Sequence, residues 1–443
     1  MPVDRPICSR RDALLLGAAA LCVPGAAFAS ADPPVPESLD GVGPLSDFTL
    51  SNATLVLPSG DTVVGGVRVE AGAIADLGPG VKGGLDLGGD WLAAGIVDCG
   101  NAVGTFEVGQ EGSSRDDDEA SAAVTPDARI RDGYNPLSIT IPVARSGGLT
   151  HALVLPGGNR LVPGQAALVR YAGESVPEAV LQPSAGLLVR LGKGGTSGDG
   201  PRSRMGVAMR LRELLDAVKL PEAAEATEES RRRRKAPPAP PAPSPDADLS
   251  PAERAWRAVR RGTLPVLFAA DRADDLVAAL ELTKAYGLRA VLVGAAEGWV
   301  VADAIAAAGV PVLLGPVNVQ PDGFGHPLAR KDNAARLHAA GVRFCFRSGD
   351  NHNARQLRVL AGMAVAHGLP RSAAYAALGA HARAIFNEPA LPRLEVGSRA
   401  SFFRCAGEII QPRHPVRALW IDGRPVSLES HQTRLRERFS VLR

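Results

Sequence analysis

The side chains that most often bind metals or transfer protons in enzymes are imidazoles, thiolates and carboxylates. Imidazoles are scarce here, because 443 residues contain only eight histidines. No two of the eight share a metal-ligand spacing on one predicted element, so the sequence offers no ready histidine metal site. His151 lies inside a predicted strand, where a histidine is more often a satisfied core residue than a ligand. The histidines are His151, His326, His338, His352, His367, His381, His414 and His431.

Other chemical motifs are equally weak. The glycine-rich segment Gly192–Gly198 superficially resembles a phosphate-binding loop, but it lacks the residue order of such loops, and we interpret it as a mobile connection. Cys99, Cys345 and Cys405 are too widely spaced to be a disulfide framework. We expect them to be buried as small apolar residues, with one bridge as an alternative. No Ser-His-Asp or Cys-His arrangement emerges.

The elements that would position a site alternate between strand and helix through the middle of the chain. About eight repeated βα units in this length favour a closed (β/α)₈, TIM-like barrel over an open parallel sheet. The predicted strands are residues 148–155, 186–191, 264–270, 289–293, 310–314 and 342–346, and the predicted helices are residues 204–220, 273–286, 299–308, 333–340 and 354–367.

Both chain ends predict short strands instead. Apolar alternation over Phe48–Leu57 and Gly66–Gly72 is matched near the C-terminus by Val416–Val426. We expect residues 45–98 and 395–430 to form one small β-sandwich module, with the barrel over 99–394. Proline-rich residues 222–251 predict a disordered, solvated insert in that barrel. Its basic run, Arg231–Lys235, is interpreted as part of this linker rather than as a polyanion site.

The motifs at the junctions resemble a known family. The segment Trp91–Asp98 resembles the start of the amidohydrolase superfamily, where Pro-Gly-Leu-Ile-Asp-x-His-x-His closes the β module and opens the barrel. Leu394–Ser401 resembles the closing segment Gly-Ser-x-Glu-x-Gly-x-x-Ala-Asp of the imidazolonepropionase-like branch. The resemblance covers nearly the whole mature chain and depends on the order of its motifs. The remaining matches are Glu119 with Thr125–Asp132, Arg204–Leu215, Pro265–Asp275 and Arg355–Leu369.

This resemblance implies a hydrolase of C–N bonds in amides or cyclic amides, with zinc activating a water at the barrel mouth. The family's ligand pattern is not met here. Its His-x-His pair falls on Gly100 and Ala102, its bridging acid on Lys193, and its two later histidines on Ala269 and Gly294. The resemblance therefore predicts a degenerate site without a bound cofactor.

Four residues remain as candidates for the site. Asp350, at the family's last acid position, is the candidate catalytic residue, with a helix cap or loop role as the alternative. Lys193 is expected to place an ammonium where metal charge would sit. Asp271 could ligate or cap a helix, and His352 lies close enough to Asp350 to reach the mouth.

The N-terminus predicts export. Ser9–Leu15 contains a twin-arginine pattern, an apolar stretch follows, and Ala29–Ala31 offers signal-peptidase sites, so residues 1–31 are expected to be cleaved. The mature protein would then be periplasmic or secreted, without a membrane anchor. A net charge of +2 gives no indication of a nucleic-acid partner.

Three functions fit these observations. The first is a catalytically impaired or silent amidohydrolase, either a partner subunit of an active paralogue or a homo-oligomer. The second is an active amidohydrolase with an unusual metal site, and the third is a periplasmic small-molecule-binding protein. Loss of nearly all ligands favours the first.

Overall fold

The structure is a computed structural model that describes residues 47–196, 199–220, 246, 248–321 and 325–440. These residues belong to one compact unit, residues 39–443. The predicted targeting segment, residues 1–31, and most of the predicted insert lie outside the described residues. None of the described helices is long and apolar enough to cross a bilayer.

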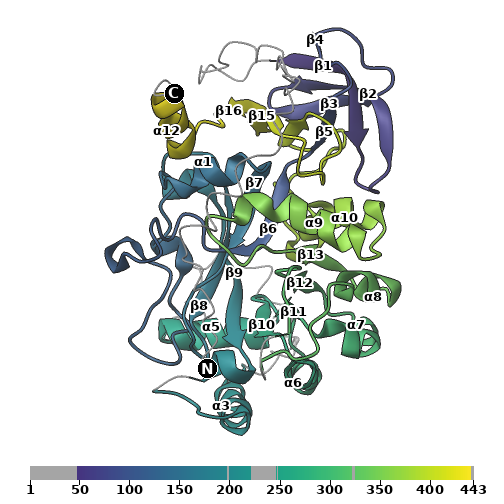
Figure 1. Cartoon of the computed structure of the whole chain (residues 1–443). Coiled ribbons are helices and arrows are strands. Elements are labelled where there is room, and N and C mark those ends of the chain that lie inside the picture. The colour runs from purple at the N-terminus through teal and green to yellow at the C-terminus, as the bar shows by residue number, and fades with distance from the viewer. Residues whose placement is uncertain (1–46, 197–198, 221–245, 247, 322–324, 441–443) are drawn as a thin grey trace, which may run out of the picture. The chain divides into compact units, whose positions relative to one another are not determined.

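Eight strands form a nearly closed barrel, which confirms the predicted fold class (Figure 1). Neighbouring strands follow chain order, and β6 and β13 are the two ends of the sheet. Their bounds are β6 (Ile96–Asn101), β7 (Leu149–Val154), β8 (Gly164–Arg170), β9 (Val180–Arg190), β10 (Val266–Ala270), β11 (Ala290–Gly294), β12 (Val312–Leu314) and β13 (Phe344–Phe346).

One strand departs from the expected parallel pattern. β8 runs antiparallel to both β7 and β9, whereas the other neighbours in this sheet are parallel. The connection from β7 to β8 spans only residues 155–163. A crossover between parallel strands needs about a dozen residues or more. A connection as short as this one must therefore reverse the direction of the chain. The barrel is therefore a (β/α)₈ variant in which one βα unit is replaced by a meander.

Helices cover the outer side of the parallel strands, and α6, α7 and α8 follow one another beside β10 to β12 in Figure 1. α6 begins where the Glu297 carboxylate accepts the Ala273 N–H at 2.9 Å, and it ends at Gly287 with φ +61°. The helices are α1 (Thr140–Arg145), α2 (Val176–Ala179), α3 (Arg204–Asp216), α5 (Pro251–Arg260), α6 (Ala273–Tyr286), α7 (Ala302–Ala308), α8 (Asn333–Ala339), α9 (Leu357–Ala366), α10 (Arg371–Ala377), α11 (Ala380–Phe386) and α12 (His431–Ser440).

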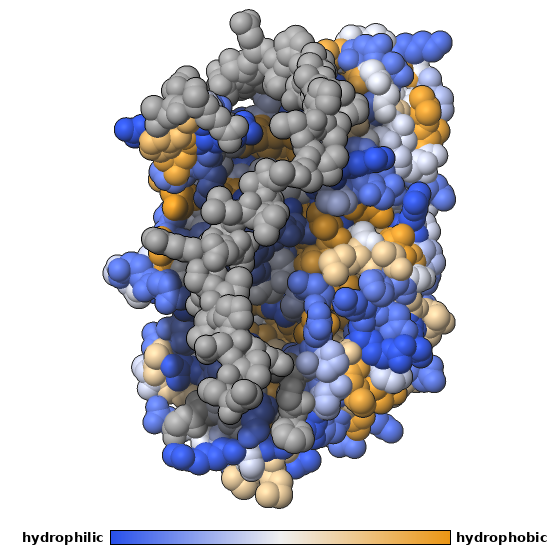
Figure 2. Space-filling view, viewed as in Figure 1, coloured by the Kyte–Doolittle hydropathy of each residue, from blue (hydrophilic) through white to orange (hydrophobic). Residues whose placement is uncertain are grey.

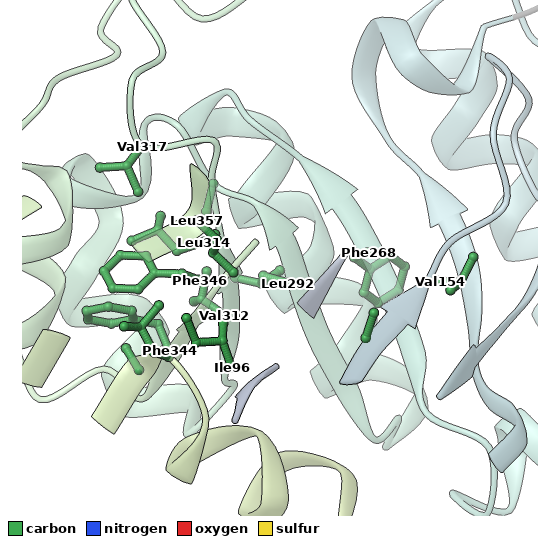
Figure 3. Close-up of a cluster of buried hydrophobic side chains, with 14 of the residues drawn as sticks. Ile96, Val154, Phe268, Leu292, Val312, Leu314, Val317, Phe344, Phe346 and Leu357 are labelled. Carbon is green, nitrogen blue, oxygen red and sulfur yellow. The ribbon is translucent and has the colours of Figure 1, made fainter. Parts of the chain in front are cut away.

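The core has an inner and an outer layer because successive strand residues face opposite sides. Leu267, Val293, Leu313 and Cys345 belong to a buried cluster formed by alternate residues of the barrel strands, which fills the barrel interior. The intervening residues pack outward into a second cluster beneath the helices. Figure 3 shows part of this outer cluster, with Phe344, Phe346, Val312 and Leu314 gathered beside Leu357 of α9.

The seam between β6 and β13 is closed by hydrogen bonds at the strand ends. Buried Asp98 accepts the Ser348 N–H at 2.9 Å and also the Ser348 hydroxyl, and the Gly349 N–H donates to the Gly100 carbonyl at 3.0 Å. The pairing of β6 with β7 shifts register between Asp98 and Asn101. Val97 and Cys99 alternate into the barrel interior, and Cys99, Cys345 and Cys405 are free thiols.

Both chain ends build the second sheet, as predicted. Its strand order is β16-β15-β14-β5-β1-β2-β3, with β4 beside β1. The strands are β1 (Phe48–Val56), β2 (Thr62–Glu70), β3 (Ala73–Gly78), β4 (Leu85–Asp86), β5 (Trp91–Ala94), β14 (Phe402–Cys405), β15 (Val416–Ile421) and β16 (Arg424–Val426). Buried Asp90 joins the two halves, since it accepts hydrogen bonds from Arg404 and, at 3.0 Å, from Arg417.

Hydrophilic residues spread over the face seen in Figure 2, with small groups of hydrophobic residues between them. This distribution is typical of a globular domain whose apolar residues are mainly buried.

Replacing Asp90 with alanine should lower the free energy of unfolding by about 3–5 kcal/mol, because two partly buried guanidinium groups lose their shared carboxylate. Chemical denaturation measures this change. Glu70→Ala, which removes an exposed ion pair with Arg68 in the same sheet, is the matched control and should cost about 0–1 kcal/mol. Equal effects of the two substitutions would contradict the role given to Asp90.

His151 predicts a loss of stability in mild acid. It is fully buried in β7, and burial lowers its pKa from 6.5 to about 4. Below pH 6.5 the unfolded chain binds a proton that the folded chain does not, so stability falls between pH 6.5 and about 4. Over this range, the free energy of unfolding should fall by about 3 kcal/mol because of His151.

Unfolding free energies measured across this pH range should fall less steeply for His151→Leu than for the unsubstituted protein. His352→Gln, at an exposed histidine, is the control and should keep the original slope. A slope unchanged by His151→Leu would show that this histidine is not the group responsible.

Candidate functional site at the barrel mouth

The candidate site lies where the parallel strands end, because their carboxyl ends meet at one rim of the barrel. Arg190 is the last residue of β9, and Asp271 and Arg347 directly follow β10 and β13. Leu188, Ala269 and Cys345, two residues earlier on the same strands, face the barrel interior. By strand alternation the three rim residues continue these inward-facing rows.

Arg347 occupies the space beside Gly100. A Cβ atom built on Gly100 would lie 2.6 Å from the Arg347 Nε, which is far inside contact distance. The Arg347 Nη1 donates to the Gly315 carbonyl at 3.1 Å. The seam bonds of Ser348 and Gly349 fix the backbone after Arg347, and the Arg347 N–H donates to the Leu314 carbonyl at 2.9 Å. The guanidinium is therefore held over Gly100, where the sequence resemblance places the family's first histidine.

Two carboxylates favour the positive charge of this guanidinium. Burial lowers the pKa of Arg347, and the charges of Asp271 and Asp98 oppose that shift. Burial also raises the pKa of Asp98, while hydrogen bonds from Ser348 and Asn101 and the charge of Arg347 oppose the rise. The arginine and the seam carboxylate therefore favour one another's charged forms.

A second arginine enters the same mouth from β9. Burial and the positive charge of Arg347 lower the pKa of Arg190 to about 10, so Arg190 stays a cation at neutral pH. Its Nη2 donates to the Pro156 carbonyl at 2.9 Å. Asp117 and Asp118 act on Arg190 through their charge, and their loop is held by Arg115–Asp117 and Arg160–Asp118 ion pairs, both at 3.2 Å.

Asp271 lies at the rim but caps no helix, because the residue flanking α6 is Arg272 and the first N–H of α6 goes to Glu297. Its Oδ1 instead accepts the Ala296 N–H at 3.2 Å. A Cβ built on Gly294, which has φ +97°, would lie 2.5 Å from this oxygen. A side chain at position 294 would therefore displace the Asp271 carboxylate.

Asp350 is used by the backbone of its own loop. Its Oδ1 accepts the N–H groups of Asn351 at 2.6 Å and Asn353 at 3.1 Å, and its Oδ2 accepts the Asn353 side-chain amide at 3.1 Å. These bonds shape the turn that leads into η6 (Ala354–Gln356) and α9. The geometry corresponds to the structural alternative considered for this residue.

The remaining candidates are dispersed. Lys193 is exposed in the short helix η4 (Gly192–Gly195). His352 is also exposed, with its ring edge-on to Phe106 at 6.5 Å between centroids. Ala269 packs against the barrel interior, and Ala102 is half-buried.

The residues at the mouth do not fit a metal ion. Gly100, Ala102, Ala269 and Gly294 carry no donor atom, and a guanidinium or a carboxylate fills the space beside two of them. Among the described residues, no group of three or more histidine, cysteine, aspartate or glutamate side chains could hold a metal. We therefore assign no metal-dependent step to this mouth.

Arg190 and Arg347 were not singled out from the sequence. Each follows an apolar run that predicts a strand, in Leu187–Arg190 and Phe344–Arg347. A cation directly after an apolar predicted strand is the signal that could have placed them at the rim, whereas their inward direction comes from the structure.

Comparison with known proteins agrees with the fold. No protein-family model matches the chain. A stretch of 87 residues is 39% identical to the amidohydrolase TasK of Hapsidospora irregularis, covering 20% of this chain but only 9% of that protein. An amidohydrolase crystal structure from Thermotoga maritima matches with a TM-score of 0.75 and 23% identity over 86% of this chain and 99% of its own.

Two further solved structures are more distant. A prolidase complexed with N-methylphosphonate-L-proline matches with a TM-score of 0.54 and 15% identity, over 86% of this chain and 100% of its own. Molinate hydrolase matches with a TM-score of 0.51 and 15% identity, over 87% and 96%. The chain thus has the fold of the amidohydrolases, which confirms the resemblance seen in the sequence.

Replacing Asp350 with alanine should lower the free energy of unfolding by about 0.5–2 kcal/mol, because backbone N–H groups lose their acceptor. Asp350→Asn keeps an oxygen acceptor and should cost only a few tenths of a kcal/mol. Thermal or chemical denaturation distinguishes the two variants. Wild-type stability in Asp350→Ala would argue against a structural role for this carboxylate.

Proposed function

We propose that this chain is an exported protein of the amidohydrolase fold that performs no metal-dependent hydrolysis, and that its barrel mouth binds a small molecule. The observation that carries the proposal is the position of Arg347, whose Nε would lie 2.6 Å from a Cβ on Gly100. A fixed positive charge there would repel a divalent cation in the same space.

The composition of the rim supports the same proposal. The hydrolysis implied by the family resemblance needs an ion that polarises the carbonyl and activates water. Glycine and alanine provide no ligand for such an ion, and Asp350 is already engaged by three hydrogen bonds from its own loop. The acid expected to move a proton thus serves to hold the turn before α9.

A role as the silent partner of an active amidohydrolase paralogue belongs to this proposal, since it requires the same loss of metal. The two arginines favour ligand binding, because a purely structural partner gains nothing from burying two like charges in its barrel. Export rests on the twin-arginine pattern of Ser9–Leu15, the apolar stretch after it and the signal-peptidase sites at Ala29–Ala31.

The protein purified from its native compartment should contain far less than one equivalent of zinc or any other divalent transition metal. It should hydrolyse no amide or cyclic amide above the buffer rate. Elemental analysis and product assays measure the two outcomes. Added zinc should leave the melting temperature unchanged, because a ligand stabilises a fold only if it binds the native state.

Stoichiometric metal, together with hydrolysis that a chelator abolishes, would refute the proposal and establish the active-enzyme alternative. In that case Asp350→Asn should also remove the activity. In a metal-free protein, the same substitution should leave any residual turnover unchanged.

A further inference from the structure

Arg190 and Arg347 come from opposite parts of the barrel wall. β9 and β13 are separated by β10, β11 and β12 in a sheet of eight strands that nearly closes on itself. Arg190 and Arg347 each stand two residues after an inward-facing strand residue, Leu188 and Cys345, at the same end of the barrel. The charge of Arg347 also contributes, after burial, to the lowered pKa of Arg190. The two guanidinium groups therefore converge over the barrel interior.

Each of these arginines has unused hydrogen-bonding capacity. Arg347 donates from Nη1 to the Gly315 carbonyl, and Arg190 donates from Nη2 to the Pro156 carbonyl. The Nε atoms of both are buried and have no hydrogen-bond partner in the described part of the chain. Buried N–H groups of this kind are unfavourable unless they meet an acceptor, so an oxygen of a bound molecule that accepts from either Nε would be stabilising.

The nearby acids are bonded elsewhere. Asp117 and Asp118 pair with Arg115 and Arg160, and Asp98 is held by Ser348. Asp271 accepts the Ala296 N–H and acts on both arginines through its charge, without an ion pair to either among the described residues. Within the described ranges, neither Arg190 nor Arg347 forms an ion pair with a carboxylate. Two neighbouring cations without a bonded counter-charge make a mouth that an anion would stabilise.

We propose that Arg190 and Arg347 together bind the carboxylate or phosphate group of a small molecule at the barrel mouth. A planar guanidinium matches such oxyanions because its N–H groups form paired, charge-assisted hydrogen bonds. The inference rests on the proposed metal-free function, since a metal ion would bind the same group directly. Asp271 at the rim would repel a second negative group, which favours ligands with one acidic end.

Calorimetry on the full mature chain in the presence of EDTA tests this proposal, with inorganic phosphate and acetate as separate probes. At least one probe should bind. Arg190→Gln and Arg347→Gln should each weaken that binding at least about tenfold, and higher salt should weaken it further. Tighter binding of phosphate would identify a phosphorylated ligand, and tighter binding of acetate a carboxylate ligand.

Arg436→Gln, at an exposed arginine of α12, is the control for general charge and should bind within about twofold of the original protein. If Arg347→Gln does not fold, Arg347→Lys replaces it: the charge remains but the paired hydrogen bonds are lost, and affinity should still fall. Circular dichroism confirms that each variant is folded.

Absence of binding by both probes, or equal weakening by Arg436→Gln, would overturn the anion site. Either result in a metal-free, inactive protein leaves the proposed loss of hydrolysis standing. Stoichiometric metal before EDTA treatment would instead refute the proposed function, so the two failures are distinguishable.

Discussion

The hydrogen bonds between Asp98 and Ser348 join residues 250 positions apart in sequence, and the arrangement of the barrel mouth depends on them. They close the seam between β6 and β13, where the sheet has no regular strand pairing. Because Arg347 precedes Ser348 and Gly100 follows Asp98 so closely, closing the seam also sets the guanidinium against the glycine. The same hydrogen bonds therefore close the barrel and place Arg347 in its mouth.

The packing of charged side chains at the mouth explains why positions 100 and 294 are glycines. A side chain at position 100 would collide with Arg347, and one at position 294 would collide with Asp271. The charged groups are therefore packed against the backbone, and introducing a side chain at either glycine would require moving an arginine or a carboxylate as well.

Secondary structure could be predicted from the sequence where local signals agree with the tertiary packing. The helix predicted over Ala273–Tyr286 has the same bounds as α6, since Gly287 provides a clear stop. Neither β8 nor its antiparallel direction was predicted. The direction is set by the short connections on either side of β8 rather than by its own residues. The inward direction of Arg347 also escaped the sequence, since three-residue β13 is too short for alternation to show which way the next side chain points.

The shared β sheet has a consequence for how the chain is made. β5 lies between β1 and β14, so one edge of the N-terminal strands has no partner until residues 402–405 exist, and β15 and β16 come later still. The barrel seam likewise waits for Ser348. During synthesis the early strands would expose unpaired backbone edges, which invite wrong pairing until they are covered. The barrel can therefore close only after Ser348 has been synthesised, and the second sheet only after β16 (Arg424–Val426).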